Sequence, residues 1–150
     1  MKKLILIHVM AALILVVLLL AKTDSVRAAD FFCTSGDVTC LIAAVNSANA
    51  TPGKHIINLE PGIYTFQTPV SNFTALPFIT GSIQIQAIAD EPPTVIERDP
   101  AAATIFTILR VSATGELTLS GLTVQRSSSP VSAITNLGVL SLQNCVITDK

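Results

Sequence analysis

Short stretches of alternating apolar and polar positions follow one another along most of the chain. They occupy residues 56–59, 63–66, 82–87, 94–97, 104–111, 116–120, 122–125, 139–143 and 145–148. Each is rich in Ile, Val, Leu and Thr and is bounded by Gly, Pro, Asn, Asp or Ser, which is the pattern of short β-strands. The chain is therefore predicted to be all-β.

A helical period appears once, at residues 39–49. Leu41, Ile42, Val45 and Ala48 fall at positions i, i+1, i+4 and i+7, which places them on one face of a helix. Asp37 or Thr39 can cap its start, and the sequence Thr-Pro-Gly at 51–53 ends it. Because no second helical pattern follows, a sheet built from βαβ units is disfavoured.

An internal repeat organises the second half of the chain. Residues 115–124 align without gaps on residues 138–147, at an offset of 23. Gly121 and Asn144 interrupt the alternation at the same place in both copies, and both residue types accept a left-handed backbone, so a sharp corner is predicted there. The matched apolar pairs are Leu117/Leu140, Leu119/Leu142, Leu122/Cys145 and Val124/Ile147.

A strand, a one-residue corner and a second strand, repeated at a fixed period, are typical of one coil of a parallel β-solenoid. Residues 83–86 show the same alternation one and a half periods earlier. The alternative is an antiparallel β-sandwich, which leaves the shared corner unexplained and lacks the Asn-Gly or Asp-Gly hairpin signals. We expect a cap over residues 29–53 and solenoid coils over residues 54–150.

The N-terminus has the layout of a secretory signal. Lys2 and Lys3 precede an apolar run over residues 4–21 that only His8 interrupts, and residues 26–28 place small side chains at the −3 and −1 positions of a cleavage site. We predict a signal peptide over residues 1–28, cleaved after Ala28. An uncleaved membrane anchor is the alternative, because the run approaches the length of one span. Either way the rest of the chain is exported.

Export makes the cysteines informative. Cys33 and Cys40 lie seven positions apart, and outside a reducing compartment they are expected to form a disulfide. A metal or redox site is the weaker alternative, because the spacing is not Cys-x-x-Cys and His55 is the one histidine outside the signal. Cys145 occupies an apolar position of the repeat, so a buried structural thiol is expected. We expect no metal and no cofactor.

Charge excludes one class of partner. The net charge is −1, and residues 29–150 carry five Lys and Arg against nine Asp and Glu. Without a basic patch, nucleic acid is not an expected partner.

Candidate chemical and modification sites are few. Glu97 and Asp99 would share one face of a strand at about 7 Å, a separation that glycosidase carboxylates can have. Charged residues beside a turn are usually only hydrated, so no catalytic residue is expected and these two are weak candidates. Asn49 and Asn72 each begin an Asn-x-Thr acceptor pattern for glycosylation, which matters only in a eukaryotic host.

Residues 33–150 carry a family resemblance. Its features are the cysteine-led helix at 39–49 with its Ala-Asn ending, the strand at 56–59, the Gly-x-Tyr-Thr strand at 62–65 and the coil at 117–124. With them the chain resembles exported right-handed parallel β-helix proteins, more narrowly those with a Cys-Ser-Leu-Arg-Glu-Ala-type N-terminal motif, related to polymorphic outer-membrane and adhesin-like proteins. The resemblance implies a right-handed winding and a helix that covers the first coil, which fits the need to cover open strand edges.

The resemblance implies a non-enzymatic protein that is secreted or lies at the cell surface or outer membrane, and that acts as a stalk or adhesive surface. Extracellular carbohydrate or a host or cell-surface protein is the expected partner. Membrane contact is expected only through the signal or a C-terminal anchor downstream. Because the second repeat runs to Thr148 with no capping pattern, we expect the N-terminal part of a longer solenoid or a truncated form. The alternatives are a polysaccharide lyase or hydrolase of the pectin-lyase-like fold, and a remnant without activity.

Overall fold

The computed structural model describes residues 28–71, 73–126 and 131–149. Within these ranges the chain is mostly β-strand with one helix, and every pair of named strands is parallel. The all-β prediction is therefore confirmed, and the antiparallel sandwich is wrong. The signal predicted at residues 1–28 falls, apart from Ala28, outside the described residues, as does Asn72.

The strands form three sheets. The first has the order β1-β2-β4-β7-β10, with β1 at Asp30–Cys33, β2 at Lys54–Leu59, β4 at Ser82–Ala87, β7 at Glu116–Ser120 and β10 at Val139–Gln143. The second has the order β11-β8-β5-β3, with β3 at Gly62–Phe66, β5 at Thr94–Arg98, β8 at Leu122–Arg126 and β11 at Val146–Asp149. The third pairs β6 at Leu109–Val111 with β9 at Ile134–Asn136.

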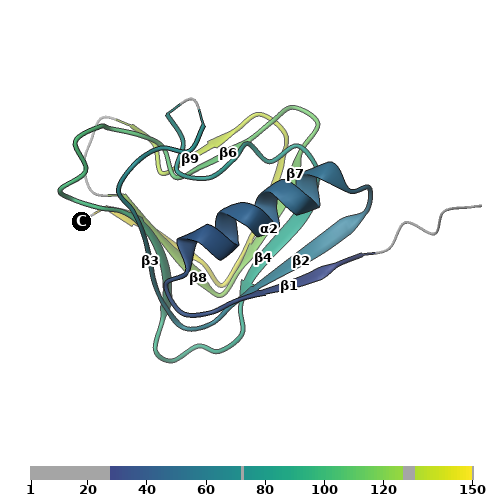
Figure 1. Ribbon diagram of the computed structural model, residues 1–150, viewed down its shortest axis with the longest axis horizontal. Helices are drawn as coiled ribbons and strands as arrows, with labels where there is room; N and C mark the ends of the chain where they lie inside the picture. Colours follow the sequence, from purple (N-terminus) through teal and green to yellow (C-terminus); the bar gives the residue numbers. More distant parts are fainter. Residues whose placement is uncertain (1–27, 72, 127–130, 150) are drawn as a thin grey trace, which may run out of the picture.

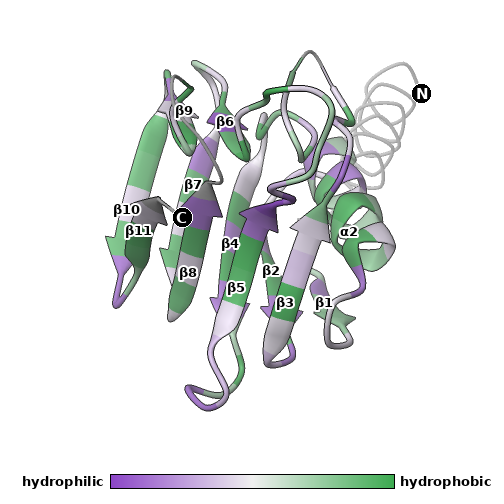
Figure 2. Ribbon diagram, turned by 90° about the vertical axis from the view of Figure 1, so that its left-hand side faces the viewer, coloured by the Kyte–Doolittle hydropathy of each residue, from purple (hydrophilic) through white to green (hydrophobic). Residues whose placement is uncertain are grey.

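From β2 onward, and apart from the strands of the third sheet, the chain visits the first and second sheets alternately, and each visit adds a strand beside the previous one (Figures 1 and 2). Leu117 is in register with Leu140, and Val124 with Ile147. Both pairs are 23 residues apart, so the sequence repeat is the hydrogen-bonding register of the two sheets. Like side chains are stacked on like side chains in adjacent strands as a result.

The segment 83–86 lies closer to the repeat than its sequence spacing suggested. Ile83 pairs directly with Leu117, so this strand belongs to the adjacent layer and not to one and a half periods earlier. Part of the excess length lies at the corner between β4 and β5, where residues 88–93 form a loop. The equivalent corner between β7 and β8 consists of Gly121 alone.

The predicted corners are confirmed by the backbone. Gly121 has a φ of 67° and Asn144 a φ of 52°, both in the left-handed region. Most side chains are strained there, whereas Gly has no Cβ and Asn tolerates the conformation. The corner therefore selects these residue types by local sterics.

The third sheet, together with residues 74–79, forms a third wall beside the two larger sheets, and it departs most from the sequence prediction. A strand was expected over residues 104–111, but β6 begins only at Leu109. The amides of Ile108 and Leu109 both donate to the carbonyl of Ala133, so regular extended pairing breaks at this point. Residues 74–79 complete the wall through bridges from Thr74 to Thr107 and from Ile79 to Val111.

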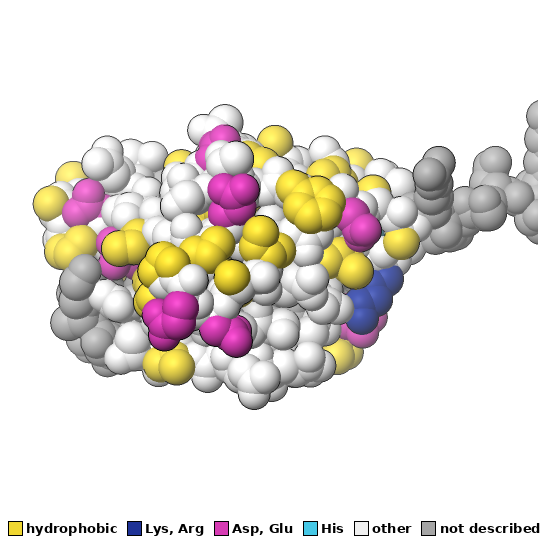
Figure 3. All heavy atoms as spheres, turned by 90° about the horizontal axis from the view of Figure 1, so that it is seen from below, with side chains coloured by type: hydrophobic (Ala, Val, Ile, Leu, Met, Phe, Trp, Pro, Cys, Tyr) yellow, Lys and Arg dark blue, Asp and Glu magenta, His cyan; other side chains and the backbone are white. Residues whose placement is uncertain are grey.

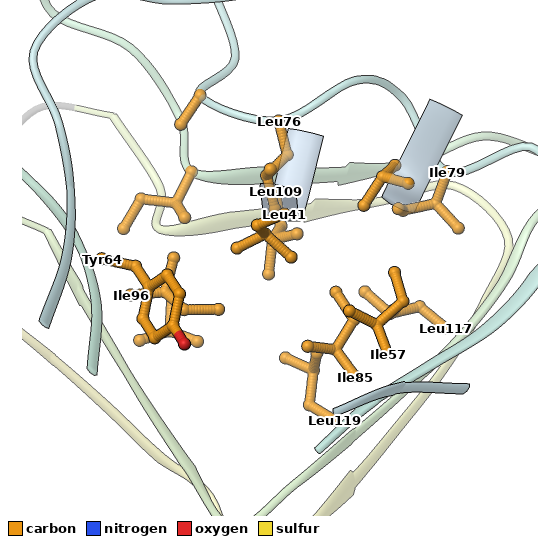
Figure 4. Close-up of a cluster of buried hydrophobic side chains, with 14 of the residues drawn as sticks. Leu41, Ile57, Tyr64, Leu76, Ile79, Ile85, Ile96, Leu109, Leu117 and Leu119 are labelled. Atoms are coloured by element: carbon orange, nitrogen blue, oxygen red, sulfur yellow. The ribbon is translucent and has the colours of Figure 1, made fainter. Parts of the chain in front are cut away.

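The core fills the space between the three walls (Figure 4). Ile57, Ile85, Leu117 and Leu119 come from the first sheet and Tyr64 and Ile96 from the second, while Leu76, Ile79 and Leu109 close the third side. Each of these side chains is fully buried. One wall alone could not bury its apolar face, so the three walls form a single interior.

Helix α2, at Val38–Ala50, covers one end of this interior (Figures 1 and 2). Its first turn is capped by Asp37, whose Oδ1 accepts a hydrogen bond of 2.9 Å from the amide of Cys40. The inward stripe is buried and consists of Leu41, Ala44, Val45 and Ala48. The predicted helix at 39–49 and its covering role are confirmed to within one residue at each end.

The opposite end of the stack is formed by β10 and β11. Leu142 and Ile147 have exposed fractions of 47% and 43%, whereas Leu119 and Val124, their partners one layer inward, are fully buried. Burial at a given repeat position thus depends on whether another layer lies on each side.

Candidate functional site

The disulfide predicted from the cysteine spacing is present and ties β1 to the helix. Cys33 and Cys40 are bonded, with their Cα atoms 5.6 Å apart. Cys33 is the last residue of β1, and Cys40 lies in the first turn of α2. The bond therefore closes the turn at residues 34–37 and fixes the covering helix to the edge strand of the first sheet.

Tyr64 fastens the same turn from inside. Its hydroxyl lies 3.1 Å from the carbonyl of Cys33, 3.0 Å from that of Thr34 and 3.1 Å from that of Glu60. Burial raises the pKa of Tyr64 to about 12, and the nearby carboxylates of Glu60 and Asp37 act in the same direction. The neutral phenol can donate its proton to these carbonyls, whereas the phenolate would face three acceptors.

Asn49 joins the end of the helix to the third wall. Its Nδ2 donates to the carbonyl of Phe78 at 2.7 Å, and its Oδ1 accepts from the amides of Thr80 and Gly81 at 2.8 and 3.1 Å. A glycan on Nδ2 would have to displace the contact with Phe78. The structure therefore gives Asn49 a role in joining the helix to residues 78–81 that its acceptor pattern did not reveal.

Glu97 and Asp99 do not form an open pair of carboxylates. Glu97 is buried, with an exposed fraction of 7%, and accepts hydrogen bonds from Thr65 Oγ1 at 3.1 Å and Gln125 Nε2 at 3.4 Å. Asp99 follows the end of β5, and its Oδ1 accepts from the amide of Ala101 at 2.8 Å. The first carboxylate bridges neighbouring strands and the second stabilises a turn.

In the sequence, a buried basic residue, Arg98, stands between these two carboxylates, and the sequence pattern did not single it out. Arg98 has an exposed fraction of 2% and is in register with the buried Phe66. Its guanidinium donates to the carbonyl of Thr104 at 3.1 Å and lies 5.6 Å from the ring centre of Phe106. A cation over an aromatic ring is a stabilising arrangement, so Arg98 anchors residues 104–106 to β5.

A row of amides crosses the outer face of the first sheet. We call Asn58, Gln84 and Gln86 the amide row. Gln84 Nε2 donates to Gln86 Oε1 at 2.7 Å, Gln86 Nε2 donates to Asn58 Oδ1 at 2.7 Å, and Asn58 Nδ2 donates to the carbonyl of Phe31 at 3.3 Å. Each amide orients the next, so the row links β4 through β2 to β1.

The face seen from below has scattered hydrophobic side chains, several separate acidic groups and one small basic group (Figure 3). Neighbouring the amide row in register are Thr118, Ser120, Ser141 and Gln143 of the next two strands. Asn58 and Thr118 are buried, whereas Ser141 and Gln143 are exposed and Gln84, Gln86 and Ser120 are half-buried. The last five side chains can offer uncharged hydroxyl and amide groups to a partner.

Cys145 is less buried than its repeat position predicted. It is a free, half-buried thiol that packs against the core, and its Sγ lies 3.3 Å from the carbonyl of Gln143. Its partner position Leu122 is buried, because another strand lies beside it. Cys145 contacts the core as predicted, but it lies in the outermost layer, so one side of the residue has no neighbouring strand in the described chain.

In the described part of the chain, no group of three or more His, Cys, Asp or Glu side chains is placed to hold a metal ion. No helix in the same residues is long and apolar enough to cross a membrane. No family model, curated protein sequence or solved structure matches the chain.

Proposed function

We propose that the chain is a right-handed parallel β-helix with a helical cap. The alternation between two parallel sheets supports this, since each strand pairs with the strand of the same sheet in the next layer. Right-handedness is supported by a general rule: a connection between two parallel strands of one sheet is right-handed in about 98% of cases. The corner residues Gly121 and Asn144, which share a left-handed backbone conformation, occupy the same position in successive coils.

Its function, in our proposal, is that of an exported, non-enzymatic protein of the cell surface or the extracellular medium, serving as a stalk or adhesive surface. The observation that carries this is the in-register stack of parallel strands, because it extends in one direction and presents a continuous outer face. The disulfide supports an oxidising compartment. We also propose that the chain is related to adhesin-like β-helix proteins with the Cys-Ser-Leu-Arg-Glu-Ala-type motif.

The amide row supports a choice of partner within this function. The half-buried Gln84 and Gln86 carry uncharged amides, and Phe32, with an exposed fraction of 70%, lies in register with the buried Asn58 at one end of the row. Hydroxyl-rich carbohydrate and the polar surface of another cell-surface protein both match such a face. We propose carbohydrate as the first ligand class to test, since an exposed aromatic ring beside amides suits a sugar ring.

Export is tested by expressing the full chain with a C-terminal tag in a host with a secretory pathway. We expect the protein outside the cytosol, with Cys33 and Cys40 resistant to alkylation until a reductant is added. The matched control replaces apolar residues of segment 4–21 by polar ones and should retain the protein inside with reduced cysteines. Uncleaved, cytosolic protein with free Cys33 and Cys40 would contradict the proposal.

The enzymatic alternative is tested with the exported protein and polygalacturonate in the presence of calcium. We expect no release of unsaturated sugar. Activity that disappears in Glu97→Ala and Asp99→Ala would replace the proposed stalk or adhesive role with a lyase. Activity unchanged in both variants would point to contamination, since a catalytic carboxylate must be sensitive to its removal.

A further inference from the structure

A buried histidine lies at the point where the described chain enters the first sheet. The backbone nitrogen of Ala29 is 3.1 Å from Nδ1 of His55, whose side chain is fully buried. Ala28 is exposed, whereas Ala29 is half-buried. The carbonyl of Ala29 accepts a hydrogen bond of 3.1 Å from the amide of Ile56, so both polar backbone atoms of Ala29 are engaged.

The other ring nitrogen fixes which proton His55 carries. Nε2 lies 2.9 Å from the carbonyl of Thr51, and a carbonyl oxygen can only accept. Nε2 must therefore carry a hydrogen, and Nδ1 of the neutral ring presents its lone pair to Ala29. The arrangement is a hydrogen-bond acceptor held in place by the segment that follows α2 and aimed at one nitrogen atom.

We propose that His55 is a binding site for the α-amino group of the mature protein. This inference rests on the proposed export and on cleavage after Ala28. Hydrolysis of the bond between Ala28 and Ala29 adds one water molecule: the carboxylate leaves with the signal, and the nitrogen of Ala29 becomes an amine, largely protonated at neutral pH. The nitrogen that donates to Nδ1 as a neutral amide would then donate as an ammonium.

The change strengthens the contact and makes it specific for the chain start. A charge-assisted hydrogen bond is roughly twice as strong as a neutral one. A chain that begins at Asp30 would lack the nitrogen, and a chain that retains Ala28 would offer only the amide. Because Ala29 directly precedes the edge strand β1, a bound amino group would fasten the end of this strand to β2.

The test uses the exported full chain after its N-terminus has been determined by sequencing and intact mass. The protein is treated briefly with an amine-acylating reagent, and the acylation of the Ala29 α-amine is compared with that of Lys54 Nζ. Lys54 is exposed and precedes His55 directly, so it is an internal reference. Normalised to the ratio in urea-unfolded protein, we expect native Ala29 to be protected on the order of tenfold, the factor that about 1.4 kcal/mol of hydrogen bonding supplies.

Two substitutions at His55 distinguish the role of Nδ1 from that of Nε2. In His55→Gln, the side-chain amide reaches the Nε2 position and can still donate to Thr51, but no acceptor remains at Nδ1. In His55→Asn, the side-chain oxygen takes the Nδ1 position and can accept from Ala29. We expect the protection to be lost in His55→Gln and largely kept in His55→Asn, which a general loosening of the fold would not produce.

The possible outcomes distinguish the inference from the proposed function. Exported protein that starts at Ala29 but shows no protection in the wild type overturns the amino-group site and leaves export standing, whether or not the variants fold. Exported protein that starts at another residue overturns the site as well. Cytosolic, uncleaved protein contradicts the proposed function, and this result is visible before any labelling.

Discussion

Two leucines that share one position of the repeat should differ sharply in their contribution to stability. Leu119 and Leu142 are in register in adjacent strands, β7 and β10. Leu119 has a strand on both sides and is fully buried, whereas Leu142 lies in the outermost strand with an exposed fraction of 47%. Replacing each with Ala removes the same atoms, so any difference reports the packing of the layer.

The magnitude follows from burial. The three carbons that Leu has beyond Ala are worth about 0.8 kcal/mol each when buried, or about 2.4 kcal/mol together. Leu119→Ala also leaves a closed cavity, which places the expected loss in the range of about 2.5–5 kcal/mol. Leu142→Ala loses about half of the transfer term and leaves no closed cavity, so about 1.2 kcal/mol is expected.

Urea unfolding of the exported protein, followed by far-UV circular dichroism, measures the difference. With a slope of about 1–3 kcal/mol/M, a gap near 2 kcal/mol separates the two midpoints by about 1 M. The slopes of the two variants should agree, because neither change alters the surface exposed on unfolding. Equal midpoints would refute the reasoning, since they would require Leu142 to be as well covered in solution as Leu119.

Three further outcomes are expected. Tyr64→Phe should lower the free energy of unfolding by about 1 kcal/mol at neutral pH. Burial raises the pKa of Tyr64 to about 12 from 10.0, so the wild type should lose stability as the pH rises between these values. In calorimetric scans over this pH range the variant should lose less. Gly121→Asn should unfold near the wild-type midpoint because Asn occupies the equivalent corner, whereas Gly121→Val should lose about 1–2 kcal/mol from its φ of 67°; equal losses would contradict the corner argument. Replacing Cys33 and Cys40 by Ser should cost about 2.5 kcal/mol in the chain-entropy account, and an unchanged melting temperature would show that the closed turn is ordered without the bond.

Local chemistry alone was enough to predict several features. The strand at 116–120, the helix at 39–49, the corners and the disulfide all depend on patterns within a few residues: period-two alternation, a helical apolar stripe, residue types that accept a left-handed backbone, and a short cysteine spacing. The 23-residue repeat is a longer signal, but it became visible because both copies lie in adjacent strands with the same positions in register.

The roles of Asn49, His55 and Tyr64, which join the N-terminal cap to the sheets, could not be predicted in the same way. Beside contacts four residues away, His55 and Tyr64 contact backbone atoms 26 to 31 residues away, and Asn49 contacts backbone atoms 29 to 32 residues away. A backbone carbonyl or amide is present at every position, so the sequence holds no trace of which one is used. Their polar type was visible, but their role was not.

The sequence by itself determined the strand-rich class, the helix, the covalent bond and the register of the 23-residue repeat, because each follows from side-chain periodicity or from the steric and covalent limits of single residues. Only the tertiary structure decided that Glu97 is buried between neighbouring strands, that β6 begins at Leu109, and that Leu142 is half-exposed while Leu119 is not. These depend on which strand lies alongside, and burial is a property of the neighbour as much as of the residue.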